Sequence, residues 1–256
     1  MFNSFIIQRK FKNMRLDQIL TETVKFVKTK QRAVALIMSG NVFLGEKKID
    51  KPGKIMKQNQ IIRIKDNNNP WVSRGGIKLQ KAISFFGVNV EDKICLDIGC
   101  STGGFTEVLF KKKAKKIYAV DVGYGQFDWK LRNSKNIILI EKTNARFLDK
   151  NIIKDSLDLI VCDVSFISLK KVILPCKKLL KEEFQIITLI KPQFEVERKL
   201  VGKGGIVKNN SIHKKVCEDI FQWFSEIFSP DYIKIIESPI SGQKGNKEFL
   251  IYVKKN

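Results

Sequence analysis

The chain has 256 residues, of which 43% are hydrophobic, so it can bury more core than one small domain needs. Its 48 Lys and Arg residues outnumber its 26 Asp and Glu residues, which gives a net charge of +22. This excess favours an anionic partner, with nucleic acid as the first candidate and a membrane surface as the second. A codon bias toward lysine is the alternative explanation of the charge.

The positive charge is concentrated near the start of the chain. Residues 1–66 carry a net charge of +10, and the other 190 residues carry +12. We therefore expect a binding element in the first quarter of the chain. No apolar run approaches the roughly 20 residues that span a bilayer. The stretch Phe5–Ile7 is too short for the apolar core of a signal peptide.

Cysteine and histidine usage argues against a disulfide scaffold and against a zinc site. The cysteines are odd in number, none forms a CxxC pair, and His213 is the single histidine. The cysteines are Cys95, Cys100, Cys162, Cys176 and Cys217. We expect no metal, and a reducing cytoplasm as the location.

The polar segment Lys65–Pro70, KDNNNP, divides the chain because it can hold no core. Before it, apolar residues at helical spacing predict helices over Arg15–Phe26 and Gln31–Met38. Short strands are predicted at Val42–Leu44 and Gln60–Lys65. Together these elements form a small, basic α+β module.

After this boundary, strands and helices alternate, which predicts an α/β fold with a doubly wound, mostly parallel sheet. The predicted strands are Ile94–Ile98, Ile117–Val122, Ile137–Glu141, Leu157–Asp163 and Gln185–Ile190. The predicted helices between them are Phe105–Lys112, Gln126–Leu131 and Leu169–Leu180, and Pro175 in the last predicts either a kink or a later start of that helix. A helix over Ser211–Phe228 then precedes an antiparallel edge pair, Tyr232–Glu237 and Glu248–Val253.

Small residues follow the first of these strands, in the sequence LDIGCSTGGF over 96–105. They let a ligand approach the backbone at the carboxyl end of the strand. The GxxxGG spacing differs from the dinucleotide fingerprint GxGxxG. The next strand ends at Asp121, whose carboxylate can accept hydrogen bonds from both hydroxyls of a ribose. This combination is typical of S-adenosylmethionine sites, and the simpler alternative is a tight turn with an incidental Asp.

Four further residues, Lys78, Asp163, Lys191 and Glu248, lie near strand ends or just ahead of the first strand. Strand ends converge on the cleft of such a sheet. Lys191 directly follows an apolar strand, where burial and a second cation would favour the neutral amine that a general base requires. Each residue alone could be a surface charge, but together they predict a catalytic cluster.

The chain resembles the TlyA-type rRNA methyltransferases, also labelled hemolysin A, in which an S4 RNA-binding domain precedes an FtsJ-like methyltransferase domain. The matching motifs are MRLDQIL (14–20), WVSRGGIKL (71–79), LDIGCSTGGFTEVL (96–109), YAVDVGYGQ (118–126), TNAR (143–146), CDVSFISL (162–169), IKPQFE (190–195), KGGIV (203–207) and SPISGQKGNKEF (238–249). The resemblance implies an S4-type domain over 14–66, a linker at 67–70 and a class I, Rossmann-like methyltransferase domain over 71–256. Residues 1–13 are a basic extension or a mis-assigned start, and we favour the second.

The resemblance implies S-adenosylmethionine-dependent 2′-O-methylation of ribose in ribosomal RNA, with cytidine as the target. The family's Lys-Asp-Lys-Glu tetrad falls on Lys78, Asp163, Lys191 and Glu248. Lys191 would help take the proton from the 2′-hydroxyl, Lys78 would orient the sugar, and Glu248 would position the target. Asp163 would lie beside the methyl donor and the lysines. The implied cofactor contacts are Gly99, Ser101, Gly103, Phe105, Asp121, Asn144 and Asp163.

The same resemblance assigns RNA contacts to Arg15, Lys30, Arg32 and Arg74. The S4 module departs from the family pattern, with Thr29-Lys30 where Ser-Arg is common and Phe43-Leu44-Gly45 where Val-Asn-Gly is frequent. Lys30 and Arg32 keep the charge, so contact with the RNA backbone is retained. The implied partner is ribosomal RNA or a ribosomal subunit, bound by a monomer without a membrane partner.

Two other classes compete with this interpretation. A non-catalytic ribosome-assembly factor would keep the fold, but the intact tetrad and cofactor loop argue against it. A pore-forming hemolysin is disfavoured by the missing membrane span. We expect His213 at the surface of its helix, Phe221 and Trp223 in packing contacts, and the lysine run 111–116 in solvent.

Overall fold

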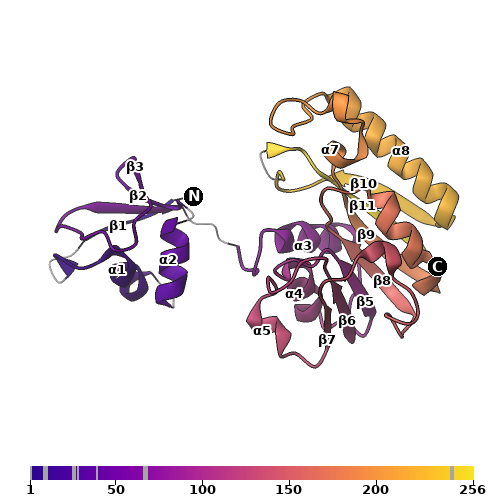
Figure 1. The fold of residues 1–256 in the computed structure, drawn as a ribbon, viewed down its shortest axis with the longest axis horizontal. Helices are drawn as coiled ribbons and strands as arrows, with labels where there is room; N and C mark the ends of the chain where they lie inside the picture. Colours follow the sequence, from indigo (N-terminus) through magenta and orange to yellow (C-terminus); the bar gives the residue numbers. More distant parts are fainter. Residues whose placement is uncertain are drawn as a thin grey trace. The chain divides into compact units, whose positions relative to one another are not determined.

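The structure, a computed structural model, describes residues 2–7, 11–24, 27, 29–38, 40–65, 69–242 and 245–256. The chain forms two compact units, Met1–Asn68 and Asn69–Asn256 (Figure 1). Within the described ranges, no helix combines the length and the apolar character needed to cross a membrane.

The first unit is an antiparallel sheet with the strand order β1-β4-β2-β3, accompanied by two helices. Its elements are β1 (Phe2–Ile6), α1 (Leu16–Thr23), α2 (Lys30–Met38), β2 (Val42–Leu44), β3 (Lys47–Ile49) and β4 (Ile61–Lys65). The helically spaced residues Leu16, Ile19 and Leu20 are buried in its core. The predicted end of α1 at Lys25 and Phe26 lies outside the described residues.

Residues before Met14 are part of this unit in the structure. Strand β1 pairs along its length with β4, and Ile7 and Phe11 lie in the same core as α1. The segment that the sequence suggested was an extension or a mis-assigned start thus contributes a strand and two core side chains. Neither β1 nor β3 was predicted, and β1 lies in the segment that the sequence analysis set aside as an extension or a mis-assigned start.

The second unit has a seven-stranded sheet in the order β10-β11-β9-β8-β5-β6-β7 (Figure 1). Strands β5 to β9 are parallel, and β11 runs antiparallel to both β9 and β10. The predicted doubly wound α/β sheet and antiparallel edge are confirmed. The strands are β5 (Ile94–Ile98), β6 (Lys116–Val120), β7 (Ile137–Ile140), β8 (Leu157–Cys162), β9 (Leu180–Ile190), β10 (Tyr232–Glu237) and β11 (Phe249–Lys255).

Helices cover both faces of this sheet, and each face has its own hydrophobic core (Figure 1). One face packs against α3 (Gly75–Phe86), α4 (Gly104–Lys111) and α5 (Trp129–Arg132), and the other against α6 (Leu169–Ile173), the 3-10 segment η3 (Leu174–Leu179) and α8 (Asn210–Phe228). Strand β5 alternates between them, because Cys95 points into the first core while Leu96 and Ile98 point into the second. Loops carry α7 (Pro192–Glu195) and the 3-10 turns η2 (Ala145–Phe147) and η4 (Arg198–Leu200).

Three local predictions need correction. The helix predicted over Leu169–Leu180 ends at Ile173, because Pro175 has no N–H to continue it, and η3 follows. His213 is 5% exposed and therefore buried, not at the surface. Phe221 is 40% exposed, whereas Trp223 packs against the rings of Phe224 and Phe228 as predicted.

Candidate active site

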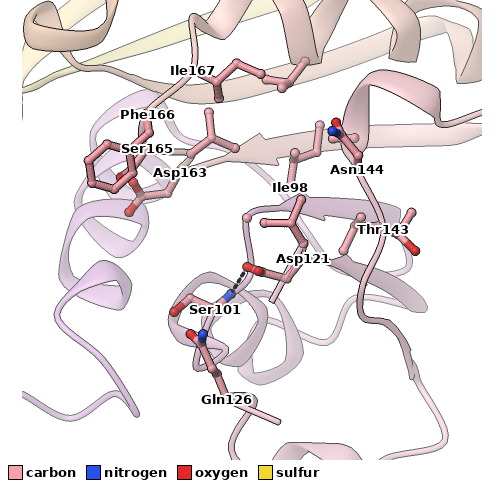
Figure 2. A pocket seen from close by; sticks show the side chains of 16 residues that line it. Ile98, Ser101, Asp121, Gln126, Thr143, Asn144, Asp163, Ser165, Phe166 and Ile167 are labelled. Atoms are coloured by element: carbon pink, nitrogen blue, oxygen red, sulfur yellow. Dashed lines mark hydrogen bonds between the residues drawn. The ribbon is translucent and has the colours of Figure 1, made fainter. Parts of the chain in front are cut away.

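The strand order reverses direction around β5, where β6 lies on one side and β8 on the other. In open α/β sheets, ligands bind at the carboxyl ends of the strands beside such a reversal. A cavity of about 460 Å³ opens there (Figure 2). Its lining includes Ile98, Gly99, Ser101, Val120, Asp121, Thr143, Asn144, Asp163, Phe166 and Ile167.

Asp121 connects the loops that follow β5 and β6. Its Oδ2 accepts a hydrogen bond from the backbone N–H of Ser101 at 2.8 Å, drawn as a dashed line in Figure 2. Its Oδ1 accepts from the backbone N–H of Gly123 at 2.6 Å. These contacts fix the carboxylate at the cavity wall. Each oxygen keeps a second lone pair, with which it can accept from a ribose hydroxyl.

Gly99 allows the loop after β5 to approach the end of β8. Its φ of +80° lies in the left-handed region that favours glycine. A Cβ at this position would lie 2.9 Å from the backbone oxygen of Asp163. Any side chain at position 99 would therefore push the two loops apart and change the cavity between them.

A second cavity, of about 260 Å³, contains the four residues of the predicted tetrad. The Lys78 Nζ lies 2.6 Å from Glu248 Oε2 and 3.5 Å from Asp163 Oδ2. The Lys191 Nζ lies 2.6 Å from Asp163 Oδ1 and donates to Ser165 Oγ at 2.9 Å. Lys78, Lys191 and Glu248 are 7%, 8% and 3% exposed, so these charges are removed from bulk solvent and compensated by one another.

Four separate elements bring the tetrad together. Lys78 projects from α3, Asp163 follows β8, Lys191 follows β9, and Glu248 precedes β11. The register of the antiparallel pair sets Phe249 of β11 opposite Ile190 of β9, so Glu248 and Lys191 extend from the same point of the sheet. The structure thus brings together the residues that the sequence placed at converging strand ends, and their catalytic roles stay a prediction.

The charge environment of Lys191 differs from the one expected. The sequence argument counted burial and the like charge of Lys78. The structure adds the carboxylate of Asp163, which lies between the two lysines and attracts both. The Lys78 charge is further compensated by Glu248. The site is therefore a balanced cluster of two cations and two anions.

The two cavities share a wall. Gly99, Ser101, Asp163, Ser165 and Phe166 line both of them. Groups bound in the two cavities would therefore both lie close to Asp163.

The residues predicted to contact the cofactor lie in three places, which are the larger cavity, the smaller cavity and the N-terminal cap of α4. Five of them line the larger cavity: Gly99, Ser101, Asp121, Asn144 and Asp163. Phe105 lines the smaller cavity. Gly103 caps α4, where an added Cβ would meet the side chains of Leu131 and Phe127 at 2.7 and 3.0 Å, so it allows close packing of α4.

Some cavity residues were missed by the sequence analysis. They include Gln126 and Thr143 in the larger cavity, Gln193 and Phe194 in the smaller one, and Ser165 and Phe166 in both. Phe166 is 87% exposed, has a φ of +65°, and its ring centroid lies 5.0 Å from that of Phe194. Ser165 and Phe166 follow Asp163, and Gln193 and Phe194 follow Lys191, all within three positions, so the strand-end rule that found Asp163 and Lys191 could have been extended to these four residues.

The residues predicted to contact RNA differ from one another in their exposure and in the partners that they bind. Arg15 binds the buried carboxylate of Asp17 through two hydrogen bonds of 3.0 and 2.8 Å, which lower the pKa of Asp17. Lys30 is exposed at the start of α2, and the side chain of Arg32 lies outside the described residues. The exposed Arg74 donates to the backbone oxygen of Ser241 at 2.9 Å.

Asp97, which lines neither cavity, and Cys100, which lines the smaller one, have altered pKa values. Burial raises the pKa of Asp97 to about 7, while the hydroxyl of Thr106, donating to Oδ2 at 2.6 Å, acts in the opposite direction. Burial also raises the pKa of the Cys100 thiol, and the carboxylates of Asp97 and Asp121 add to the effect. Cys100 is therefore a neutral thiol at pH 7 and not a nucleophile.

Comparison with known proteins agrees with this architecture. Residues 71–255 match the family described as FtsJ-like methyltransferase, and residues 14–62 match the S4 domain. The fold and these two family matches together define the class of protein, which is a methyltransferase that carries an S4 domain.

Two curated relatives and one solved structure cover most of the chain. Hemolysin A of Brachyspira hyodysenteriae is 41% identical over 93% of this chain and 99% of that protein. The 16S/23S rRNA (cytidine-2′-O)-methyltransferase TlyA of Mycobacterium tuberculosis is 36% identical over 89% of this chain and 85% of that protein. A solved structure from Streptococcus thermophilus, labelled a hemolysin, superposes with a TM-score of 0.73 at 36% identity, covering 96% of this chain and 90% of that one. The chain belongs to the TlyA family.

Proposed function

We propose that this chain transfers a methyl group from S-adenosylmethionine to the 2′-hydroxyl of a cytidine ribose in ribosomal RNA. The observation that carries the proposal is the wall shared by the two cavities at Asp163. One cavity presents a carboxylate suited to ribose hydroxyls, and the other holds two buried lysines. Cytidine and ribosomal RNA as the substrate are suggested by the name of the Mycobacterium tuberculosis relative.

The larger cavity fits S-adenosylmethionine by size and by chemistry. A volume of about 460 Å³ is within the range for sites that bind small molecules. Asp121 would accept from the ribose hydroxyls, and the apolar Val120 and Ile167 would pack on the adenine ring. When bound, S-adenosylmethionine supplies an electrophilic methyl group. Of the residues predicted to hold it, Gly99, Ser101, Asp121, Asn144 and Asp163 line this cavity, whereas Phe105 lines the smaller one and Gly103 would act through the packing of α4.

The tetrad would activate and orient the acceptor. A ribose hydroxyl is a weak nucleophile at neutral pH, so a positioned base is needed. Lys191 would first release its own proton to solvent, and its neutral Nζ would then accept the proton of the 2′-hydroxyl, while Lys78, held by Glu248, would orient the sugar. General-base catalysis of this kind contributes ~10²–10⁴ in rate. Holding the methyl donor and the ribose in the right geometry contributes the remainder of the rate enhancement.

The first unit would recruit the RNA. We assign residues 14–66 to the S4 domain, with Arg15, Lys30 and Arg32 as backbone contacts, and residues 71–256 to the methyltransferase domain. Arg74 would add a contact near the smaller cavity. The net charge of +10 over residues 1–66 supports binding to a polyanion. We further propose that the protein acts as a monomer in the cytoplasm.

The proposal is tested by mapping 2′-O-methylation on ribosomal RNA from cells with and without this protein. We expect at least one cytidine methylation to disappear in its absence and to return with the wild-type chain but not with Lys191→Ala. An unchanged map would indicate the non-catalytic assembly factor. A liposome-leakage assay tests the remaining alternative, to which the hemolysin labels of two relatives point.

A further inference from the structure

Asn246, two residues before Glu248, uses its side chain to hold a distant loop. It is 4% exposed. Its Oδ1 accepts from the backbone N–H of Val207 at 3.0 Å, and its Nδ2 donates to the backbone oxygen of Gly205 at 2.9 Å. The amide therefore binds both ends of one short backbone segment in the KGGIV motif, for which the sequence suggested no role.

His213 of α8 extends this network. Its Nε2 lies 2.9 Å from the backbone oxygen of Val207, and the side chain is 5% exposed. Val207 therefore uses its N–H for Asn246 and its oxygen for His213. Buried polar groups of this kind are costly to leave unpaired, so loss of one partner disturbs the others.

The backbone of Asn246 leads from this network to the tetrad. Its carbonyl oxygen accepts from the N–H of Gly242 at 2.9 Å, and the backbone oxygen of Glu248 accepts from Ser238 at 2.9 Å. Gly242 lies against the Glu248 carboxylate so closely that a Cβ there would overlap Oε1. The other oxygen, Oε2, is the one that binds Lys78 at 2.6 Å.

We propose that Asn246 and His213 are positioning residues, which act through Gly242 to hold the Glu248 carboxylate against Lys78. This proposal rests on the proposed methyl transfer, because it assigns the network a purpose in that reaction. Neither side chain touches the lysines. Their effect would pass through the hydrogen bond from the Gly242 N–H to the Asn246 carbonyl oxygen, since Gly242 lies against the Glu248 carboxylate.

The first test measures single-turnover methyl transfer to ribosomal RNA, with S-adenosylmethionine affinity measured in parallel. We expect Asn246→Ala to slow transfer roughly 10- to 100-fold, since small displacements of a positioning group have effects of this size. The cofactor affinity should stay within a few fold, because Asp121 and its loop are not part of the network. Asn136→Ala is the matched control, since its amide binds the backbone oxygen of Lys115 at 2.9 Å on an exposed surface. The control should keep the wild-type rate.

A double-mutant cycle separates positioning from a general loss of stability. In a Glu248→Gln background, we expect Asn246→Ala and His213→Ala to slow transfer little further, because the group they position is already altered. Rate losses that multiply in full would show that the network acts independently of Glu248, and would overturn the proposal.

If Asn246→Ala does not fold, as judged by thermal unfolding, Gly242→Ala provides the second variant. Its Cβ displaces the Glu248 carboxylate directly, so transfer should slow while the cofactor affinity is kept. A wild-type rate in a folded Asn246→Ala or Gly242→Ala variant contradicts the positioning proposal alone. A wild-type chain that methylates no ribose contradicts the proposed function instead.

Discussion

At the scale of single residues, Lys191 carries the strongest prediction. Its Nζ is buried between Asp163 and Ser165 at the end of β9. We expect Lys191→Ala to lower the single-turnover rate by ~10²–10⁴ and to leave the cofactor affinity within a few fold. Lys191→Arg should fail as well, because a guanidinium stays protonated and cannot accept the proton.

The arginine variant decides between a base and a charge at this position. Near-normal transfer by Lys191→Arg would show that position 191 contributes charge alone, and the base would have to be sought elsewhere. Lys112→Arg, on an exposed lysine of the same unit, is the matched control and should behave as wild type.

Asp121 carries a prediction about cofactor binding. We expect Asp121→Ala to weaken the binding of S-adenosylmethionine by roughly 1.5–3 kcal/mol, the range for losing a charge-assisted hydrogen bond. The structure adds a second reason, because the same carboxylate fixes the N–H groups of Ser101 and Gly123. Calorimetry measures the affinity, and an unchanged value in a folded variant would remove Asp121 from the site.

Asp97 predicts a pH dependence of stability. Burial raises its pKa in the folded protein to about 7, above its unfolded value, so the folded state binds more protons between these values. The free energy of unfolding should therefore fall as the pH rises from the unfolded pKa of Asp97 through about 7, and level off above that pH. Asp97→Asn keeps an acceptor for Thr106 and removes the ionisation.

Urea unfolding of both proteins at pH 5 and pH 8 checks this prediction. The wild-type chain should lose more stability than Asp97→Asn between the two pH values. Equal losses would show that Asp97 does not ionise differently in the folded and unfolded states.

At the scale of elements, the strand β8 and the helix α6 are joined by a loop that α7 holds in place. The Glu195 carboxylate of α7 accepts from the N–H of Leu169 and from the hydroxyl of Ser168, both at 2.7 Å. It thereby caps α6 from outside and fixes the loop that carries Phe166. We expect Glu195→Ala to destabilise the protein by about 1 kcal/mol, as loss of a helix cap does.

Denaturant unfolding measures this loss, and Glu195→Gln is the control, since an amide keeps one acceptor for the Leu169 N–H. The glutamine variant should retain part of the stability. If alanine and glutamine lose the same amount, the carboxylate charge and not the cap is what stabilises the loop.

The elements also show what a sequence can and cannot predict. The strands β5 to β9 were found because their apolar runs are bounded by polar turns. Helix α3 was missed although it carries Lys78, because it opens with Gly75 and Gly76, which disfavour helix formation in isolation. Packing of α3 against α4 overrides that preference, and a single sequence does not show such packing.

The sequence predicted some residues of the candidate active site but not all of the contacts that hold them. Asp121 and Asp163 lie at the ends of predicted strands and Lys191 directly follows one, and the rule that strand ends converge on one cleft was enough to group them. The contact of Gly242 with Glu248 depends on the non-periodic hydrogen bonds from Gly242 to Asn246 and from Ser238 to Glu248, which no sequence period encodes. The buried position of His213 likewise depends on Val207, a partner outside its helix.

At the scale of the whole molecule, the question is which unit brings the RNA. Among the residues that the structure describes, the two cores of the second unit draw on Trp71 and later residues, and the core of the first unit draws on residues up to Ile64. A chain that begins at Trp71 should therefore fold and bind S-adenosylmethionine with wild-type affinity, yet methylate ribosomal RNA poorly. The full chain should lose RNA affinity steeply as salt rises, because Lys and Arg contacts to phosphates release counterions.

RNA affinity and methylation rate are both measured with the same ribosomal RNA. Filter binding at increasing salt gives the slope of log K against log salt for the full chain and for the chain from Trp71, and the shorter chain should show the smaller slope. Supplying the RNA at saturating concentration should restore much of its methylation rate, because the tetrad is intact and only recruitment is impaired. If the shorter chain modifies ribosomal RNA as fast as the full chain at low RNA concentration, the basic first unit is not the recruiting element, and the RNA contacts must lie on the methyltransferase unit itself.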